Sequence, residues 1–183
     1  MNIDWKDIAG HFEFKPFYDF LLSRLKPGSS MVEVGVLCGK SIAYLAQRSK
    51  SEQLGLNLWG VDIFVSHPEW GFVLGEWANR PSFYDLYKSN LVQAGVDDVI
   101  KTLAMTSVEA AKFFKDGTLD CVFIDAVHDT ESVTADILAW RPKVKPGGIL
   151  SGDDYIAPWG VIKAVDELVP NRNIMGQTWW VEI

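Results

Sequence analysis

Short apolar runs alternate with amphipathic segments along most of the chain. The apolar runs are rich in β-branched residues, and most are followed by a segment with apolar residues at helical spacing. We expect strands at 31–35, 56–62, 99–103, 119–125 and 148–151, and helices at 17–25, 41–46, 83–94, 107–114, 130–140 and 161–168. Apolar strands that alternate with helices predict a mostly parallel sheet with helices on both faces. The pattern therefore predicts a doubly wound α/β fold with about seven strands.

The two ends of the chain and one connection depart from this alternation. Residues 1–28 should contribute a covering helix, and the tail 173–183 contains two short β-type runs that predict a C-terminal antiparallel hairpin. The connection 64–81 is long for a compact domain and rich in aromatic residues. It is either a lid over a binding site or a packed aromatic cluster. With no internal repeat, residues 1–183 are expected to form a single domain.

Composition narrows the classes of function. The 183 residues include 48% hydrophobic and 22% charged side chains, as in ordinary globular proteins. The net charge of −7 would repel a phosphate backbone, which disfavours a nucleic-acid partner. No apolar run reaches the roughly 18 residues of a membrane-spanning helix. Cys38 and Cys121 lie in different predicted elements and no export leader is evident, so we expect reduced thiols and a cytoplasmic location; a homo-oligomer stays open.

Carboxylates follow the ends of the predicted strands. Glu33 lies at the end of the first strand, Asp62 of the second and Asp125 of the fourth. The pair Asp153 and Asp154 follows the fifth strand. Because ligands of open parallel sheets bind at the carboxyl ends of the strands, these acids should share one rim with any ligand.

The segment 35–41 (GVLCGKS) predicts a tight turn between the first strand and its helix. Gly35 and Gly39 would let a ligand approach the backbone closely, and the helix N-terminus beyond them offers N–H groups to an anion. The dinucleotide fingerprint G-x-G-x-x-G is absent, and the P-loop pattern fails because its first glycine would fall at Val34. Asp62 stands where an acid can accept hydrogen bonds from both hydroxyls of a ribose. These residues are compatible with a nucleoside that carries no pyrophosphate.

Three segments resemble a known family. They read FIDAVH at 123–128, VTADILAW at 133–140 and KPGGILSGDDY at 145–155. In this combination the chain resembles class I S-adenosylmethionine-dependent methyltransferases, and among them the small-molecule O-methyltransferases of the macrocin and catechol types. The likeness covers nearly the whole chain and implies a Rossmann-like methyltransferase fold.

The resemblance also implies roles for individual residues. The methionine portion of S-adenosylmethionine would lie against Glu33 and the turn, and the ribose against Asp62. A divalent cation such as Mg²⁺ would lower the pKa of the acceptor hydroxyl. The implied cofactor-binding set is Glu33, Gly35, Gly39, Ser41, Asp62, Ile63, Ser107 and Asp125; the implied metal ligands are Asp125, Asp153 and Asp154; and the implied catalytic residues are Asp125 and His128, with His128 as the base.

Structural roles compete with several of these assignments. The aspartates, Ser107 and His128 could instead cap or pack against the helices that follow them. Cys38 is expected to be a buried filler, because no histidine is placed in sequence to pair with it.

The implied reaction is methyl transfer to a hydroxyl oxygen of a small molecule. A sugar or glycosylated natural product is favoured as acceptor, with a catechol-like phenol second. The rivals are a non-catalytic S-adenosylmethionine-binding protein and a nicotinamide-dependent oxidoreductase, against which the missing fingerprint argues.

Overall fold

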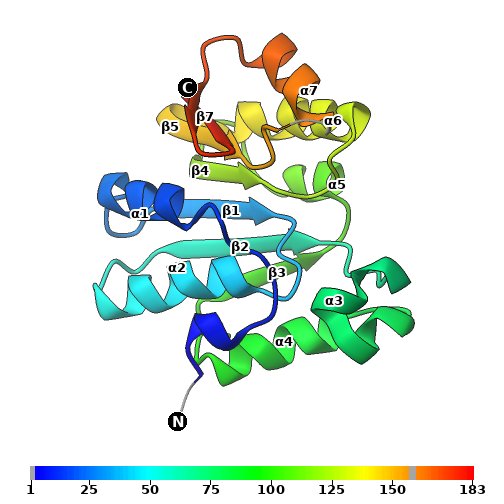
Figure 1. Cartoon of the computed structure of the whole chain (residues 1–183). Helices are drawn as coiled ribbons and strands as arrows, with labels where there is room; N and C mark the ends of the chain where they lie inside the picture. Colours follow the sequence, from blue (N-terminus) through cyan, green and yellow to red (C-terminus); the bar gives the residue numbers. More distant parts are fainter. Residues whose placement is uncertain (1–2, 157–159) are drawn as a thin grey trace.

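A seven-stranded sheet forms the centre of the protein (Figure 1). The computed structural model describes residues 3–156 and 160–183, and all statements on the structure refer to them. The strand order is β3-β2-β1-β4-β5-β7-β6. The strands are β1 (Ser30–Val34), β2 (Asn57–Asp62), β3 (Ile100–Ala104), β4 (Leu119–Ile124), β5 (Val144–Gly152), β6 (Asn173–Met175) and β7 (Thr178–Glu182). The first five run parallel, and β6 and β7 form the expected antiparallel hairpin against β5.

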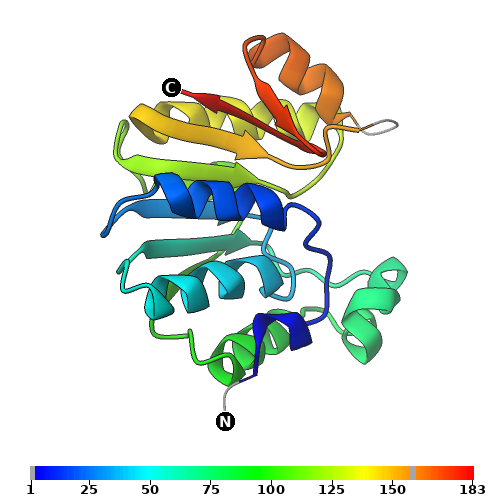
Figure 2. The same cartoon turned by 60° about the vertical axis from the view of Figure 1, so that its left-hand side comes forward.

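Helices cover both faces of the sheet, as the apolar strands predict (Figures 1 and 2). One core joins the sheet to α1 (Lys15–Arg24), α2 (Lys40–Ser51) and α4 (Tyr84–Gln93). A second core joins the opposite face to α5 (Ser107–Ala111), α6 (Thr130–Trp140) and α7 (Val161–Leu168). Successive side chains of β1 point to opposite faces of the sheet, so that Met31 belongs to the first core and Val32 to the second. The expectation of a doubly wound fold is confirmed.

The long connection after β2 contains short helices. They are η2 (Pro68–Trp70), α3 (Gly71–Leu74) and η3 (Gly75–Asn79), and a bridge between Val65 and Ser82 closes the base of the excursion. Leu74 and Ala78 are buried and anchor it to the first core. Two further 3₁₀ turns, η1 (Trp5–Asp7) and η4 (Arg141–Lys143), lie outside the predicted elements. Among the described residues, no helix is long and apolar enough to cross a membrane.

The chain reverses its direction across the sheet between β1 and β4. From β1 it passes to β2 and β3 on one side, and then returns to β4 and β5 on the other. Such a switch point is where open α/β sheets bind ligands. Here it places the turn after β1 beside the loop after β4, and so joins the two parts of the predicted site.

Candidate functional site

The turn after β1 is held by a hydrogen bond within it and by one from α4. The Gly39 N–H donates to the Val36 carbonyl at 2.7 Å, and the Asn90 amide, from α4, donates to the Cys38 carbonyl at 3.0 Å. Gly39 has a φ of 87° and is the N-cap of α2, with no side chain capping the helix. The turn therefore presents the N-terminus of a twelve-residue helix at the carboxyl edge of the sheet.

Asp62 links this turn to the end of β2. Its carboxylate accepts the Leu37 N–H at 3.0 Å on one oxygen and the Phe64 N–H at 2.8 Å on the other. Burial raises the pKa of Asp62, and these backbone donors oppose that effect. Since each carboxylate oxygen has a second lone pair, both oxygens can still accept a hydroxyl donor. The geometry is compatible with the expected ribose contact.

Glu33 lies below the turn, at 1% exposure. Its carboxylate accepts the Tyr18 hydroxyl at 2.9 Å and the Ser41 hydroxyl. Burial raises the pKa of Glu33 to about 8, in opposition to both hydrogen bonds. The structure thus engages the side chains of Glu33 and Ser41 with each other. They support the turn from beneath.

Glu33→Gln should therefore make stability less dependent on pH. The folded protein keeps the Glu33 proton up to about pH 8, whereas an unfolded chain loses it near pH 4.3. The stability contributed by this proton is full below the lower value and is lost as pH rises through the window, by at most about 1.4 kcal/mol per pH unit. Urea unfolding at several pH values should show that the free energy of unfolding of the variant rises relative to that of the wild type between pH 5 and 8. Glu131→Gln, at an exposed position, should show the same pH dependence of the free energy of unfolding as the wild type. If Glu33→Gln also shows that dependence, the expectation is contradicted.

Gly35 allows the turn after β1 and the loop after β4 to lie in close contact. A Cβ at this position would lie 1.9 Å from the Asp125 carbonyl oxygen, and the residue has a φ of 89°. The sequence predicts that this glycine admits a ligand; the structure shows that it admits the backbone of the loop after β4.

Gly35→Ala is accordingly expected to lower the free energy of unfolding by roughly 2–4 kcal/mol, through left-handed strain plus overpacking. Gly28→Ala is the matched control, because Gly28 has a φ of 82° but no atom within 4 Å of the added Cβ. It should lose only about 1–2 kcal/mol. Equal losses in urea unfolding would show that the contact with Asp125 carries no strain.

Three side chains from two loops form a cluster beyond β4 and β5. The His128 Nε2 lies 3.0 Å from an Asp154 carboxylate oxygen and 3.6 Å from one of Asp125. One ligand atom from each of the three lies within 4.8 Å of the others, which is compatible with a shared metal ion. The structure therefore brings together two of the three predicted metal ligands, and adds the predicted base to them.

Asp153 takes a different direction from Asp154. Its carboxylate accepts the Thr178 hydroxyl, from β7, at 2.9 Å. Asp153 nevertheless lines a cavity of about 10 Å³ together with Asp125 and His128, a volume close to the minimum for one water molecule. It thus borders the cluster without belonging to it.

The cluster is strongly coupled electrostatically. Interaction with Asp125 and Asp154 raises the pKa of His128 to about 10. Burial raises the pKa of Asp125, and burial together with the Asp125 charge raises that of Asp153 to about 7. At neutral pH the His128 ring in this arrangement is protonated and does not accept a proton. It can become a base only if its carboxylate partners are engaged elsewhere.

Other predicted residues have more limited places in the site. Ile63, directly after β2, is 54% exposed at the rim. The Ser107 hydroxyl accepts the Trp140 indole N–H at 2.9 Å and thereby ties α5 to α6. Cys38 is buried, and burial raises the pKa of its thiol to about 11, in keeping with its expected role as a filler.

The sequence interpretation missed Tyr18 and the segment before α1. Tyr18 is fully buried and reaches Glu33 from the covering helix. A tyrosine within an apolar stripe was the available signal, because a buried hydroxyl needs a partner. Glu13 also adds to the raised pKa of Asp125, after burial and the nearer groups. Its position depends on the path of residues 8–14, which no local sequence pattern predicts.

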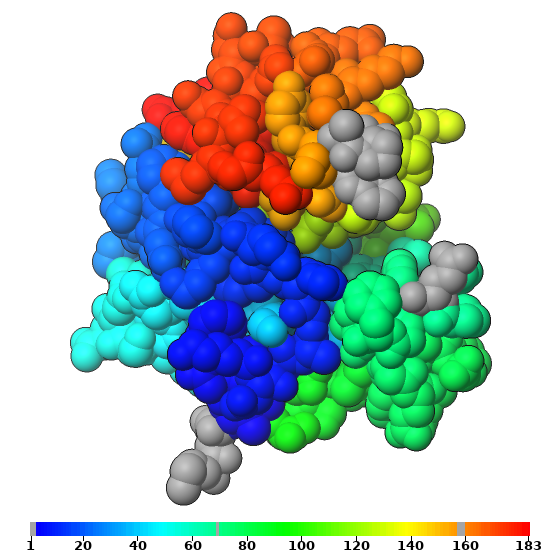
Figure 3. Space-filling view, viewed as in Figure 1, coloured from blue at the N-terminus to red at the C-terminus, as the bar shows by residue number. Residues whose placement is uncertain are grey.

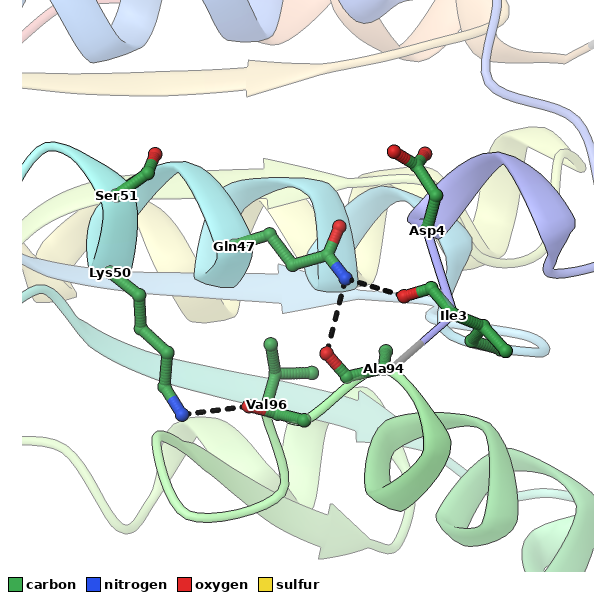
Figure 4. Close-up of a pocket in the computed structure, with 8 residues that line it drawn as sticks. Ile3, Asp4, Gln47, Lys50, Ser51, Ala94 and Val96 are labelled. Carbon is green, nitrogen blue, oxygen red and sulfur yellow. Dashed lines mark hydrogen bonds between the residues drawn. The ribbon is translucent and has the colours of Figure 1, made fainter. Parts of the chain in front are cut away.

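A second depression, of about 560 Å³, lies away from this edge. Figure 4 shows the Gln47 amide inside it, donating to the carbonyls of Ile3 and Ala94 at 2.9 and 3.1 Å. Lys50, on its wall, pairs with Asp98 at 2.6 Å. These contacts attach the start of the chain to α2 and α4, and we assign the depression a structural role.

Comparison with solved structures gives many proteins of the same fold. The cofactor-bound Rv0187 from MTB has a TM-score of 0.65 at 17% identity, covering 97% of this chain and 82% of that one. An O-methyltransferase from Bacillus cereus in complex with SAH has a TM-score of 0.61 at 16% identity, covering 96% and 83%. An rRNA methylase from Streptococcus thermophilus has a TM-score of 0.63 at 15% identity, covering 94% and 96%. At these identities the likeness establishes the fold and not the acceptor.

Sequence comparison identifies the family. No curated protein matches the chain. A family described as a methyltransferase domain matches residues 32–155, which include the turn after β1, Asp62, Asp125 and the aspartates after β5. This range is more than half of the chain and confirms the resemblance to methyltransferases. The chain belongs to this methyltransferase-domain family.

Proposed function

We propose that this protein transfers the methyl group of S-adenosylmethionine to a hydroxyl oxygen of a small molecule. The observation that carries the proposal is the joining of two sites at the switch point of the sheet. One is Asp62 with the turn after β1, and the other is the cluster of Asp125, His128 and Asp154. The first suits a nucleoside and the second suits a hydroxyl that must lose its proton.

The residues around the turn fit S-adenosylmethionine. Asp62 has lone pairs for the two ribose hydroxyls, and the uncapped N-terminus of α2 can receive the carboxylate of the methionine portion. Glu33 and Ser41 hold the turn in place, and the start of α5 flanks the position of the base. When bound, the cofactor supplies an electrophilic methyl group on sulfonium. The chain's part is to hold the acceptor oxygen in line with that group.

The cluster fits a divalent cation. Asp125 and Asp154 would hold it, with His128 as a third ligand or displaced to a neighbouring position, and with Asp153 beside it. Two carboxylates and waters suit Mg²⁺, whereas a histidine nitrogen in the set favours Mn²⁺ or another transition metal. A cation bound there would lower the pKa of an acceptor hydroxyl. With its carboxylates engaged in this way, His128 would become available as a base.

A small-molecule acceptor agrees best with the charge of the chain. The net charge of −7 disfavours RNA, although an rRNA methylase shares the fold. Sugars and glycosylated natural products remain the first candidates, and catechol-like phenols the second.

Calorimetric titration separates the proposal from its rivals. S-adenosylmethionine should bind with an affinity near the micromolar range, about −8 kcal/mol, and NADH should not. Transfer of tritiated methyl groups to a panel of glycosides and phenols, with Mg²⁺ or Mn²⁺ present, tests catalysis. Binding without transfer to any acceptor would favour a non-catalytic binding protein. NADH binding in the absence of S-adenosylmethionine binding would favour the oxidoreductase.

A further inference from the structure

We propose that the exposed side chains of Ile63, Val65, Trp70 and Phe72 form the surface on which the acceptor lies, and that the acceptor is an uncharged molecule with an aromatic portion beside its reacting hydroxyl. We call these four residues the apolar strip. The inference rests on the proposed function and narrows it: phenols and glycosides of aromatic compounds fit, and free sugars do not.

The strip is unusual in its exposure. Phe72 is 75% exposed, Ile63 and Val65 are each 54% exposed, and Trp70 is 41% exposed. All four belong to one segment of ten residues. Single exposed apolar residues are common on protein surfaces, whereas four of them within ten residues of one segment are a concentration typical of a site of interaction.

The segment that carries the strip is firmly held. Phe64, between two strip residues, is buried against the rings of Phe83, Tyr84 and Tyr87 at centroid distances of 4.8–5.4 Å. The bridge from Val65 to Ser82 closes its base. The alternation of a buried Phe64 with exposed neighbours shows that Ile63 and Val65 point outward from a backbone that Phe64 anchors.

A chain of contacts connects the strip to the acidic cluster. The Phe72 ring lies 5.7 Å from the His11 ring, and the His11 Nδ1 lies 3.2 Å from a Glu13 carboxylate oxygen. The Phe14 ring, next along the chain, lies 4.6 Å from the ring of Phe123 in β4, two residues before Asp125. Figure 3 shows the surface hollowed between the N-terminal segment in blue, the green residues around 70–80 and the yellow to orange loops above them. The strip is therefore one wall of the entrance to the proposed site.

The strip offers contact without charge. Its four side chains are apolar, and the cluster beyond it sets its carboxylates against the protonated His128 ring. A neutral ring loses little by leaving water and gains contact with Phe72 and Trp70, whereas a charged acceptor would lose its hydration without a partner on the strip. The apolar surface therefore favours a neutral aromatic acceptor.

Binding of a neutral aromatic fluorophore, N-phenyl-1-naphthylamine, tests this without knowledge of the acceptor. Its fluorescence should rise on addition of the wild-type protein. The double variant Trp70→Ser, Phe72→Ser should weaken this binding at least about tenfold, as expected from the loss of two aromatic contacts. The control is the double variant Phe113→Ser, Leu138→Ser, which removes side chains of 68% and 58% exposure near α5 and on α6. It should bind the fluorophore as the wild type does.

Two further measurements complete the test. The neutral glycoside p-nitrophenyl β-glucoside should displace the fluorophore, and glucose should not. S-adenosylmethionine should bind equally to the wild type and to both double variants. The inference is overturned if the strip variant retains the fluorophore, if the control loses it, or if the wild type binds only S-adenosylmethionine. Failure of all proteins to bind S-adenosylmethionine would instead overturn the proposed function.

Discussion

Asp62→Ala should weaken the binding of S-adenosylmethionine at least roughly 100-fold, because it removes two hydrogen bonds to a charged group, each worth about 1.5–3 kcal/mol. The loss has two sources. One is the loss of the ribose contact itself. The other is the loss of the hydrogen bond from the Leu37 N–H to Asp62 at 3.0 Å, which holds the turn in place. Isothermal titration calorimetry on the purified variant measures the combined effect.

Two variants make that measurement specific. Asp98→Ala removes an aspartate that pairs with Lys50 at a distant surface, and should bind the cofactor as the wild type does. Asp62→Asn keeps one carbonyl oxygen and the shape of the side chain, and should fall between wild type and alanine. Unchanged affinity in a folded Asp62→Ala variant would remove the cofactor assignment. Circular dichroism establishes that the variant is folded.

Local patterns predicted most of the fold correctly. The apolar run of β4 was predicted at 119–125 and is observed at Leu119–Ile124, because a continuous β-branched stretch leaves few alternatives. The start of β5 was missed by four residues. Pro146, Gly147 and Gly148 indicate a turn, but the strand passes through them with Gly147 at a φ of 77° and an irregular register opposite Leu119 to Cys121. A bulge stabilised by a neighbouring strand has no signal in the local sequence.

The acids of the site were also identified from sequence, but their partners were not. Asp153 and Asp154 are adjacent in the chain, yet one accepts from Thr178 and the other meets His128. Asp154 adopts a φ of 57°, which turns the backbone after β5. Sequence position places both residues at the rim, whereas only the backbone conformation decides which carboxylate faces the cluster.

The same rim concentrates negative charge that the protein must compensate. Glu33 retains its proton, Asp62 is neutralised in part by backbone donors, and His128 carries a positive charge between Asp125 and Asp154. Each of these arrangements lowers the negative charge at the rim, and each would respond to a cationic ligand. A sulfonium cofactor and a divalent cation are both ligands of that kind.

Asp125→Ala and Asp154→Ala should each abolish tight binding of Mn²⁺, the probe for the cation site. Loss of a residue that only hydrogen-bonds to a metal ligand weakens metal affinity roughly 10–100-fold. Loss of a direct ligand should therefore weaken the affinity for Mn²⁺ at least about 100-fold. Asp153→Ala decides between two ligand sets. The resemblance expects a loss as large as that of Asp154→Ala, whereas the hydrogen bond from Thr178 to Asp153 implies a smaller one. Titration followed by electron paramagnetic resonance measures all three.

The pH dependence of Mn²⁺ binding tests the same site independently. With its pKa at about 10, His128 holds a proton between the two carboxylates that the cation needs. Whether His128 becomes a ligand or moves aside, an arriving cation must compete with that charge, so affinity should rise with pH between 6 and 9. In His128→Ala this rise should be reduced, and binding at pH 6 should be tighter than in the wild type if the ring is a competitor, or weaker if it is a ligand. Affinity that is independent of pH in the wild type would show that the cation binds away from His128 and its carboxylates.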